Sequence, residues 1–186
     1  MRDRIKGTPA GANDSSTTAL GDWFATALFW RPQVAMLVNE RTLLPVFVPL
    51  APASTLLARI PEAIAAVLRR HGAADAFIEA ELEAMRDVRI APTNSRSVIG
   101  VMNGFAFTGE FHWQEGLTDC EELSLRMSSH LLGPLMKRGS GSPDSELAAV
   151  LHPDARSPIA RPPSLGHRRA TALLTPVPTP VPDLRR

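Results

Sequence analysis

Two short apolar runs that flank four polar residues constrain the fold of this chain more than any other feature. The runs read QVAMLV from residue 33 and LLPVFV from residue 43, and the residues between them read NERT. Each run has the length of a strand and the polar residues suit a turn, so the pattern predicts a β-hairpin over Gln33–Val48. Pro45 has no amide donor, which favours an edge strand or an orientation in which Pro45 faces away from its partner strand.

Apolar residues at helical spacing predict about five helices after the hairpin. In chain order, these helices are expected over residues 61–70, 75–86, 96–107, 118–132 and 144–151. The aromatic residues from Phe105 to Trp113 also fit the two-residue period of a strand, which remains the alternative there. A further short helix is predicted over Trp23–Trp30, with Asp22 as its N-cap.

The remaining strand signal is the sequence VRIA at residues 88–91, which Pro92 ends. The predicted fold class is therefore α+β. It consists of a small antiparallel sheet, made of the hairpin at 33–48 and the strand near 88–91, packed with about five helices.

The chain length of 186 residues indicates one domain. Residues 1–19 are polar and are expected to form a disordered lead-in, and residues 20–151 are expected to form a single α+β domain. Residues 152–186 hold eight of the 17 prolines and are expected to form a Pro/Arg-rich disordered tail. That tail carries six Arg and two Asp, a charge of +4, against 14 basic and 17 acidic residues in 1–151.

Several functional classes lack support in the sequence. A single cysteine, Cys120, rules out an internal disulfide, and no apolar run approaches the length of a membrane span. We therefore expect a cytoplasmic protein without a membrane contact. The five histidines lack metal-ligand spacing and no glycine-rich phosphate motif is present, so neither a metal nor a cofactor is expected. Cys120 falls on an apolar helix face and is predicted to be buried and inert.

The candidate binding residues are polar side chains at the ends of apolar segments. They are Asn39, Glu40 and Arg41 at the hairpin tip, and Asn94, Arg96 and Asn103 around a strand-to-helix junction. If the junction lies beside the hairpin tip, the two arginines and the amides could bind a phosphate or a carboxylate. The alternative is that asparagine and threonine shape the turns while arginine and glutamate form surface pairs.

The segment from Trp23 to Trp30 holds four of the ten aromatic residues. Core packing is one interpretation of these side chains. The other is an exposed aromatic anchor, with Trp23 and Trp30 as the residues that contact a protein partner.

Three ordered blocks resemble an uncharacterised bacterial family that is known only as a domain of unknown function. The blocks are LGDWF from residue 20, NERTLLP from residue 39 and TNSRSVIG from residue 93. The resemblance implies no activity, but it marks Asn39, Arg41, Asn94 and Arg96 among the motif positions. Similar chains often begin with an extra strand, which the start of this sequence does not show. The resemblance therefore implies an unpaired sheet edge.

A non-catalytic binding or interaction module is the favoured function, because no catalytic constellation is apparent and the aromatic segment and the basic tail could contact an unknown protein partner. The alternative is a small enzyme or an anion-binding domain that uses Arg41 and Arg96 together. A third and weaker hypothesis is nucleic-acid binding through the dilute basic tail, so nucleic acid is not the expected partner.

Overall fold

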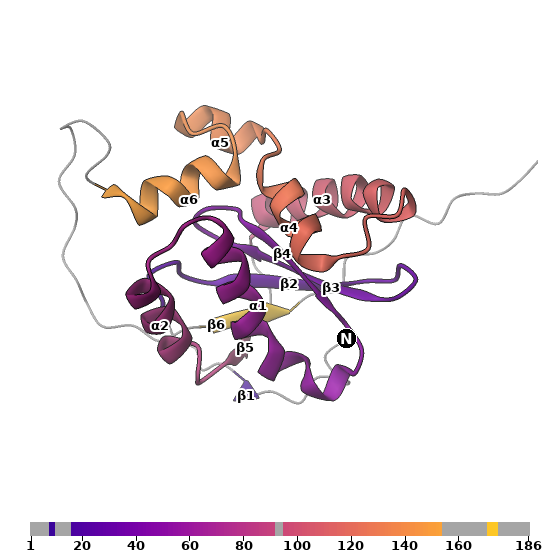
Figure 1. The fold of residues 1–186 in the computed structure, drawn as a ribbon, viewed down its shortest axis with the longest axis horizontal. Helices are drawn as coiled ribbons and strands as arrows, with labels where there is room; N and C mark the ends of the chain where they lie inside the picture. The colour runs from indigo at the N-terminus through magenta and orange to yellow at the C-terminus, as the bar shows by residue number, and fades with distance from the viewer. Residues whose placement is uncertain (1–7, 10–15, 92–94, 154–170, 175–186) are drawn as a thin grey trace, which may run out of the picture.

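The computed structural model describes residues 8–9, 16–91, 95–153 and 171–174. These residues form one six-stranded sheet with the strand order β1-β5-β6-β2-β3-β4, shown in Figure 1. The strands are β1 Thr8–Pro9, β2 Trp23–Leu28, β3 Val34–Asn39, β4 Pro45–Pro49, β5 Arg89–Ala91 and β6 Thr171–Leu174.

The sheet has an antiparallel half and a parallel half. β2, β3 and β4 pair in antiparallel fashion, which confirms the predicted hairpin. The predicted strand near 88–91 is β5, but it does not pair with the hairpin. It pairs in parallel with β1 and β6, and β6 pairs in parallel with β2.

The described residues form six α-helices, preceded by a short 3-10 turn over Ala53–Thr55. The helices are α1 Leu56–Arg70, α2 Asp75–Ala84, α3 Arg96–Gln114, α4 Cys120–Ser128, α5 Gly133–Arg138 and α6 Pro143–Leu151. Side chains of α1, α2 and α6 pack on one face of the sheet, and those of α3, α4 and α5 pack on the other. The predicted α+β class is confirmed.

The predicted helix over Trp23–Trp30 is wrong, because this segment forms β2. All six residues of β2 are buried. Trp23 and Ala25 belong to the core under α1, whereas Phe24 and Leu28 belong to the core under α3. A strand covered on both faces has a continuous apolar sequence, which the sequence pattern alone does not distinguish from a short buried helix.

Helix α3 is longer than predicted and excludes the alternative strand over Phe105–Trp113. The aromatic residues that fit a two-residue period lie on two faces of this helix: Phe105 and Trp113 are buried, and Phe107 and Phe111 are exposed. Gly109 sits inside this helix for a steric reason. A Cβ atom at that position would lie 3.0 Å from the Trp30 ring, so glycine lets the helix approach the sheet closely.

Two short strands lie within the segments expected to form the lead-in and the tail. In the lead-in, Thr8 and Pro9 form β1, and in the tail Thr171–Leu174 form β6. Both segments are strands because they pair with other strands of the sheet, β1 with β5 and β6 with β2. Their own short sequences do not predict this pairing. The rest of the predicted tail, residues 154–170 and 175–186, lies outside the described residues, as do residues 1–7 and 10–15.

Strand β4 lies at the edge of the sheet, as Pro45 predicts. The amide of Leu50 donates to the Gln33 carbonyl at 2.9 Å, and the amide of Asn39 donates to the Leu44 carbonyl at 3.0 Å. Even-numbered residues of β4 therefore direct their backbone groups toward β3. The odd-numbered residues direct theirs away from the sheet.

The outward side of β4 has only one backbone donor to satisfy. Pro45 and Pro49 have no amide hydrogen, so Phe47 carries the remaining outward amide. It donates to the Ser124 hydroxyl of α4 at 2.9 Å, and that hydroxyl donates to the Cys120 carbonyl at 2.6 Å. Helix α4 thereby covers the edge and blocks the addition of another strand.

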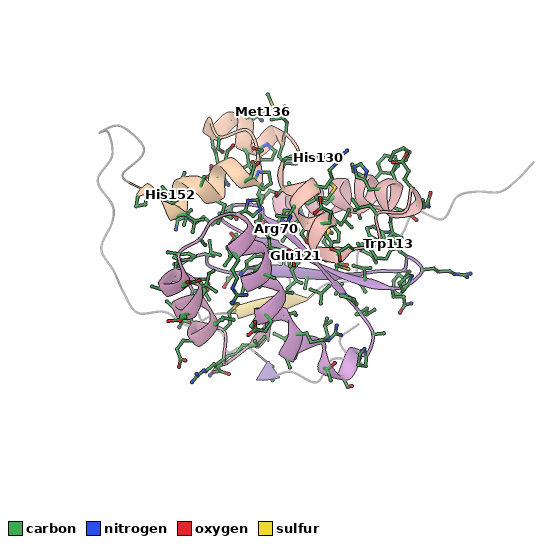
Figure 2. The ribbon with its side chains drawn as sticks, viewed as in Figure 1. Arg70, Trp113, Glu121, His130, Met136 and His152 are labelled. Carbon is green, nitrogen blue, oxygen red and sulfur yellow. The ribbon has the colours of Figure 1, made fainter. Side chains whose placement is uncertain are left out.

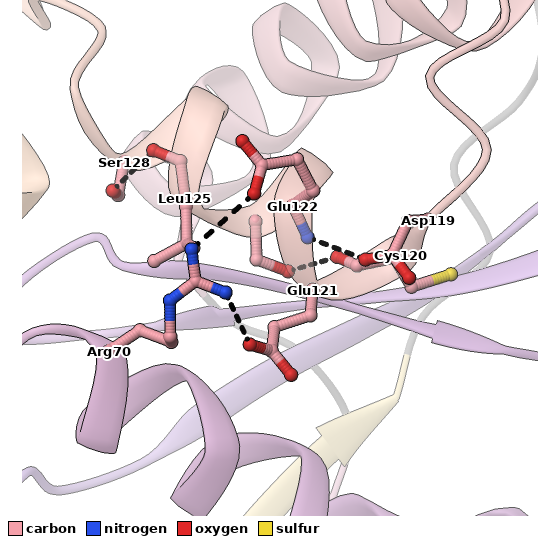
Figure 3. Close-up of polar contacts among 8 residues, drawn as sticks. Arg70, Asp119, Cys120, Glu121, Glu122, Leu125 and Ser128 are labelled. Carbon is pink, nitrogen blue, oxygen red and sulfur yellow. Dashed lines mark hydrogen bonds and ion pairs between the residues drawn. The ribbon is translucent and has the colours of Figure 1, made fainter.

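An ion pair joins α1 to the start of α4 across this covered edge. Arg70 contacts Glu121 at 2.9 Å and Glu122 at 3.5 Å. Figure 2 labels Arg70 and Glu121 on the whole chain, and Figure 3 shows both ion pairs as dashed lines. Asp119 caps α4 by accepting a hydrogen bond from the Glu122 amide at 2.8 Å. The three ion-pair side chains are about half exposed, so these contacts contribute little to the stability of the fold.

We expect Ser124→Ala to lower the free energy of unfolding by about 1–3 kcal/mol, because the buried Phe47 amide would lose its acceptor. The measurement is urea unfolding followed by circular dichroism. Ser129→Ala is the matched control, because the exposed Ser129 hydroxyl donates to the carbonyl of Arg126 in the last turn of α4 and does not contact the sheet edge. Equal stability losses in the two variants would contradict the role of Ser124 at the edge.

Candidate functional site

The turn of the hairpin is built around the side chain of Asn39, which is fully buried. Its amide nitrogen donates to the carbonyls of Leu20 and Asp22, at 2.9 and 3.3 Å. Its amide oxygen accepts from the Arg41 and Thr42 backbone amides and from the Thr42 hydroxyl, at 2.9 to 3.1 Å. This arrangement satisfies the buried amide at both ends, so Asn39 shapes the turn rather than offering free groups to a ligand.

The rest of the turn depends on the same network. The Thr42 hydroxyl accepts from the Leu44 amide at 3.2 Å, and Leu43 has a φ of 56° in the left-handed region. That conformation is uncommon for leucine and is held here by the bonds on either side of it. The Glu40 amide donates to the Asp22 carbonyl at 2.9 Å. The blocks LGDWF and NERTLLP are therefore one hydrogen-bonded unit in the folded chain.

The loop before β2 is anchored to α2 by a buried carboxylate. Glu81 is 2% exposed, and its Oε1 atom accepts from the Ala19 amide at 2.6 Å. Its Oε2 atom has no hydrogen-bond partner among the described residues. Burial raises the pKa of Glu81, and hydrogen bonds from the Ala19 and Leu20 amides oppose that rise. The loop turns at Gly21, whose φ of 82° suits glycine.

A pocket of about 530 Å³ opens between this loop, the hairpin turn and the two last helices. We name it the hairpin-turn pocket. Its lining residues are Ser16, Thr18, Ala19, Leu20, Gly21, Glu40, Arg41, Arg138 and Glu146. Two of the predicted candidates, Glu40 and Arg41, thus share one pocket.

Two guanidinium groups in this pocket are anchored to backbone carbonyls rather than to carboxylates. Arg41 donates through Nη1 to the Ala19 carbonyl at 3.2 Å. Arg138 of α5 donates through Nη1 to the Arg41 carbonyl at 3.0 Å. Neither forms an ion pair with any residue that the structure describes. A guanidinium group has five N–H donors, so both retain donors for a ligand.

The acidic residues of the pocket come from the turn and from α6. Glu40 is exposed at the turn, and Glu146 projects from α6. The Oε2 atom of Glu146 is buried and has no hydrogen-bond partner within the described part of the chain. With two arginines and two glutamates, the pocket can hold a group of either charge, and its formal charge balances. Sequence reasoning missed Arg138 and Glu146, because nothing in their local patterns indicates proximity to residue 41.

The other predicted site residues do not line the hairpin-turn pocket. Arg96 is the exposed first residue of α3, and Asn103 is exposed further along the same helix. Asn94 lies outside the described residues. A shared anion site of Arg41 and Arg96 stays a prediction, and the guanidinium that accompanies Arg41 in its pocket is Arg138.

Trp23 and Trp30 do not form an exposed anchor. Trp23 is 4% exposed and Trp30 is 8% exposed, because β2 and the residues after it lie between two helical layers. The Trp30 ring packs against Phe47 and Trp113, with centroids 6.0 and 5.4 Å apart. The Trp113 indole donates to the Arg31 carbonyl at 3.2 Å. Trp30 and Trp113 therefore hold α3 on the sheet, whereas Trp23 packs on the opposite face under α1.

A larger groove of about 800 Å³ lies between α1, α2 and the start of β5. Its lining residues are Leu57, Ala58, Pro61, Glu62, Glu79, Leu82, Glu83, Met85, Arg86, Asp87 and Val88. Arg86 pairs with Glu83 at 2.9 Å and Asp87 pairs with Arg89 at 2.9 Å. The charged residues of this groove are thus partly paired with carboxylates, whereas, in the part of the chain that the structure describes, the two arginines of the hairpin-turn pocket are not.

The remaining reactive side chains are placed for structural roles. Cys120 is half-buried, and burial, assisted by Asp119, raises its pKa to about 11, so the thiol is protonated at neutral pH. The rings of His112 and His130 meet edge to face, with their centroids 6.1 Å apart. Within the described ranges, no cluster of three or more His, Cys, Asp or Glu residues has the geometry of a metal site. No helix in the same ranges has the length and apolar character needed to cross a membrane.

The chain is thus a small α+β domain with a mixed sheet between two helical layers. Residues 1–146 match the family described as a domain of unknown function, DUF6933, and the chain belongs to this family. This confirms the predicted resemblance to a family of unknown function. A search of the curated proteins and a search of the solved structures each found no significant match.

The raised pKa of Glu81 predicts a pH-dependent difference between the native chain and Glu81→Gln. A carboxyl group with a raised folded-state pKa contributes stability below its ordinary value of 4.5 and loses it as the pH rises through the folded value. The variant lacks this loss, so its stability relative to the native chain should improve as the pH rises from about 4 to 7. The measurement is thermal unfolding across this range.

Glu79→Gln is the control for this experiment, because Glu79 is exposed on the same helix. Its stability relative to the native chain should change less with pH. If the two variants show the same pH profile, the assigned burial of the Glu81 charge is wrong.

Proposed function

We propose that this protein is a non-catalytic binding module whose ligand site is the hairpin-turn pocket. The observation that carries this proposal is the pair of arginines, Arg41 and Arg138, which line one pocket without a carboxylate partner. The Arg138 guanidinium binds the carbonyl of Arg41 itself, at 3.0 Å. The two positive groups are therefore held close to one turn although they are far apart in the sequence.

The acidic residues of the pocket narrow the ligand class. A ligand with only an anionic group would be attracted by the arginines and opposed by Glu40 and Glu146. A small molecule with one anionic and one cationic group could contact both sets of side chains. The carboxyl group of Glu146, which lines the pocket, is the acceptor proposed for the cationic group. We therefore infer a zwitterionic ligand with a phosphate or carboxylate at one end.

The lining residues support binding rather than a reaction. The Thr18 hydroxyl is a candidate nucleophile in the lining, but it already donates a hydrogen bond to the Gly21 carbonyl at 2.8 Å. The lining contains no histidine that could act as a general base for this hydroxyl. A cytoplasmic location and an additional protein partner stay predictions.

The test compares phosphoethanolamine with inorganic phosphate by isothermal titration calorimetry at low salt. Phosphoethanolamine carries both charges and should bind more tightly than phosphate. The Arg41→Ala, Arg138→Ala double variant should bind phosphoethanolamine at least about tenfold more weakly, because charge-assisted hydrogen bonds are lost. Glu146→Gln should reduce the preference for phosphoethanolamine over phosphate.

Arg126→Ala is the matched control, because it removes one positive charge from the exposed surface of α4 without touching the pocket. It should leave both affinities unchanged. Equal phosphoethanolamine binding by the native chain and the double variant would overturn the proposed site, as would the absence of binding by the native chain at about 10 mM ligand.

A further inference from the structure

The sheet contains a slot between β2 and β5 that only β6 fills. Among the described residues, β2 pairs with β3 and β6, and β5 pairs with β1 and β6. No pairing joins β2 directly to β5. Figure 1 shows β6, in yellow, lying between these two strands.

The strand that fills the slot lies outside the family match. The matched region, residues 1–146, includes β1 to β5, whereas β6 begins at Thr171. Within the matched region the sheet therefore consists of two separate pieces, β1-β5 and β2-β3-β4. Strands that flank a third strand lie about 10 Å apart, so these two pieces leave room for one extended segment.

The slot requires an occupant for reasons of hydrogen bonding. Trp23, Phe24 and Ala25 of β2 are buried and pair with residues 172–174 of β6. On the other side, β5 pairs with residues 171–173. Buried backbone groups without partners are costly, so an empty slot would destabilise the strands on both sides.

The strand that occupies the slot has few contacts. β6 has four residues, and only three residue pairs join it to each neighbour. Residues 152–170 separate it from the end of α6. A long connection lowers the effective concentration of a tethered segment, and parallel pairing is slightly weaker per residue than antiparallel pairing. Exchange of β6 for another strand that makes the same backbone hydrogen bonds therefore has a modest free-energy cost.

We propose that this slot is a strand-acceptor site and that residues 171–174 occupy it as an internal competitor. The partner is an extended segment of another polypeptide that enters parallel to β2 and β5. The sequence of β6, Thr-Ala-Leu-Leu, defines its chemistry as uncharged, mostly apolar and free of proline across four residues. Backbone hydrogen bonds to two flanking strands provide the affinity, as in other cases of strand addition. This site is independent of the hairpin-turn pocket.

The test uses the full chain and a fluorescein-labelled peptide, RRATALLTPV, which reproduces residues 168–177. Ala172→Pro removes an amide that a strand paired on both sides must donate to one neighbour, so it should release β6. Fluorescence anisotropy should then show peptide binding to the variant at least about tenfold tighter than to the native chain, since the internal competitor is gone. Val181→Pro, outside β6, is the control and should bind as the native chain does.

If Ala172→Pro unfolds the protein, the same peptide provides the second measurement. Because a ligand that binds only the folded state stabilises it, an excess of peptide should then restore the circular dichroism spectrum of the native chain. A control peptide with proline at the position that corresponds to Ala172 should neither bind the folded variant nor restore the unfolded one. The proposal is overturned if a folded variant binds the peptide no better than the native chain, or if an unfolded variant is not restored.

Discussion

The buried side-chain amide of Asn39 joins the turn of the hairpin to the loop that leads into β2. It donates to carbonyls on that loop and accepts from the amides of the turn, so neither segment can take its conformation without the other. The same turn presents Arg41 to the pocket and offers its carbonyl to Arg138. The hairpin, the loop and the candidate site therefore depend on one set of hydrogen bonds.

The second constraint is the burial of the sheet between two helical layers. Backbone amides and carbonyls at its edge strands and between β2 and β5 therefore need hydrogen-bond partners. At β4, Pro45 and Pro49 have no amide donor, and the Ser124 hydroxyl accepts from the amide of Phe47. Between β2 and β5, β6 provides the partners. The resemblance implied an unpaired edge, and in this chain the slot beside β2 is filled by a segment from beyond the family match.

Local patterns predicted the features that depend on near neighbours. The hairpin follows from two apolar runs across a polar turn, and the edge position of β4 follows from Pro45. The polar turn also directed attention to Arg41. The β2 strand was mistaken for a helix because burial on both faces removes the period-two signal. Arg138, Glu146 and β6 could not be predicted, because each gains its role from a contact with a segment far away in the sequence.

The most direct test of this account replaces Asn39 with aspartate, which keeps the size and one acceptor oxygen but removes both donors. The free energy of unfolding, from urea denaturation at neutral pH, should fall by about 3 kcal/mol or more, because a buried charge would face the carbonyls of Leu20 and Asp22. Asn103→Asp, on the exposed face of α3, should change it by no more than about 0.5 kcal/mol. A change of that small size for Asn39→Asp would contradict the central role of the Asn39 amide.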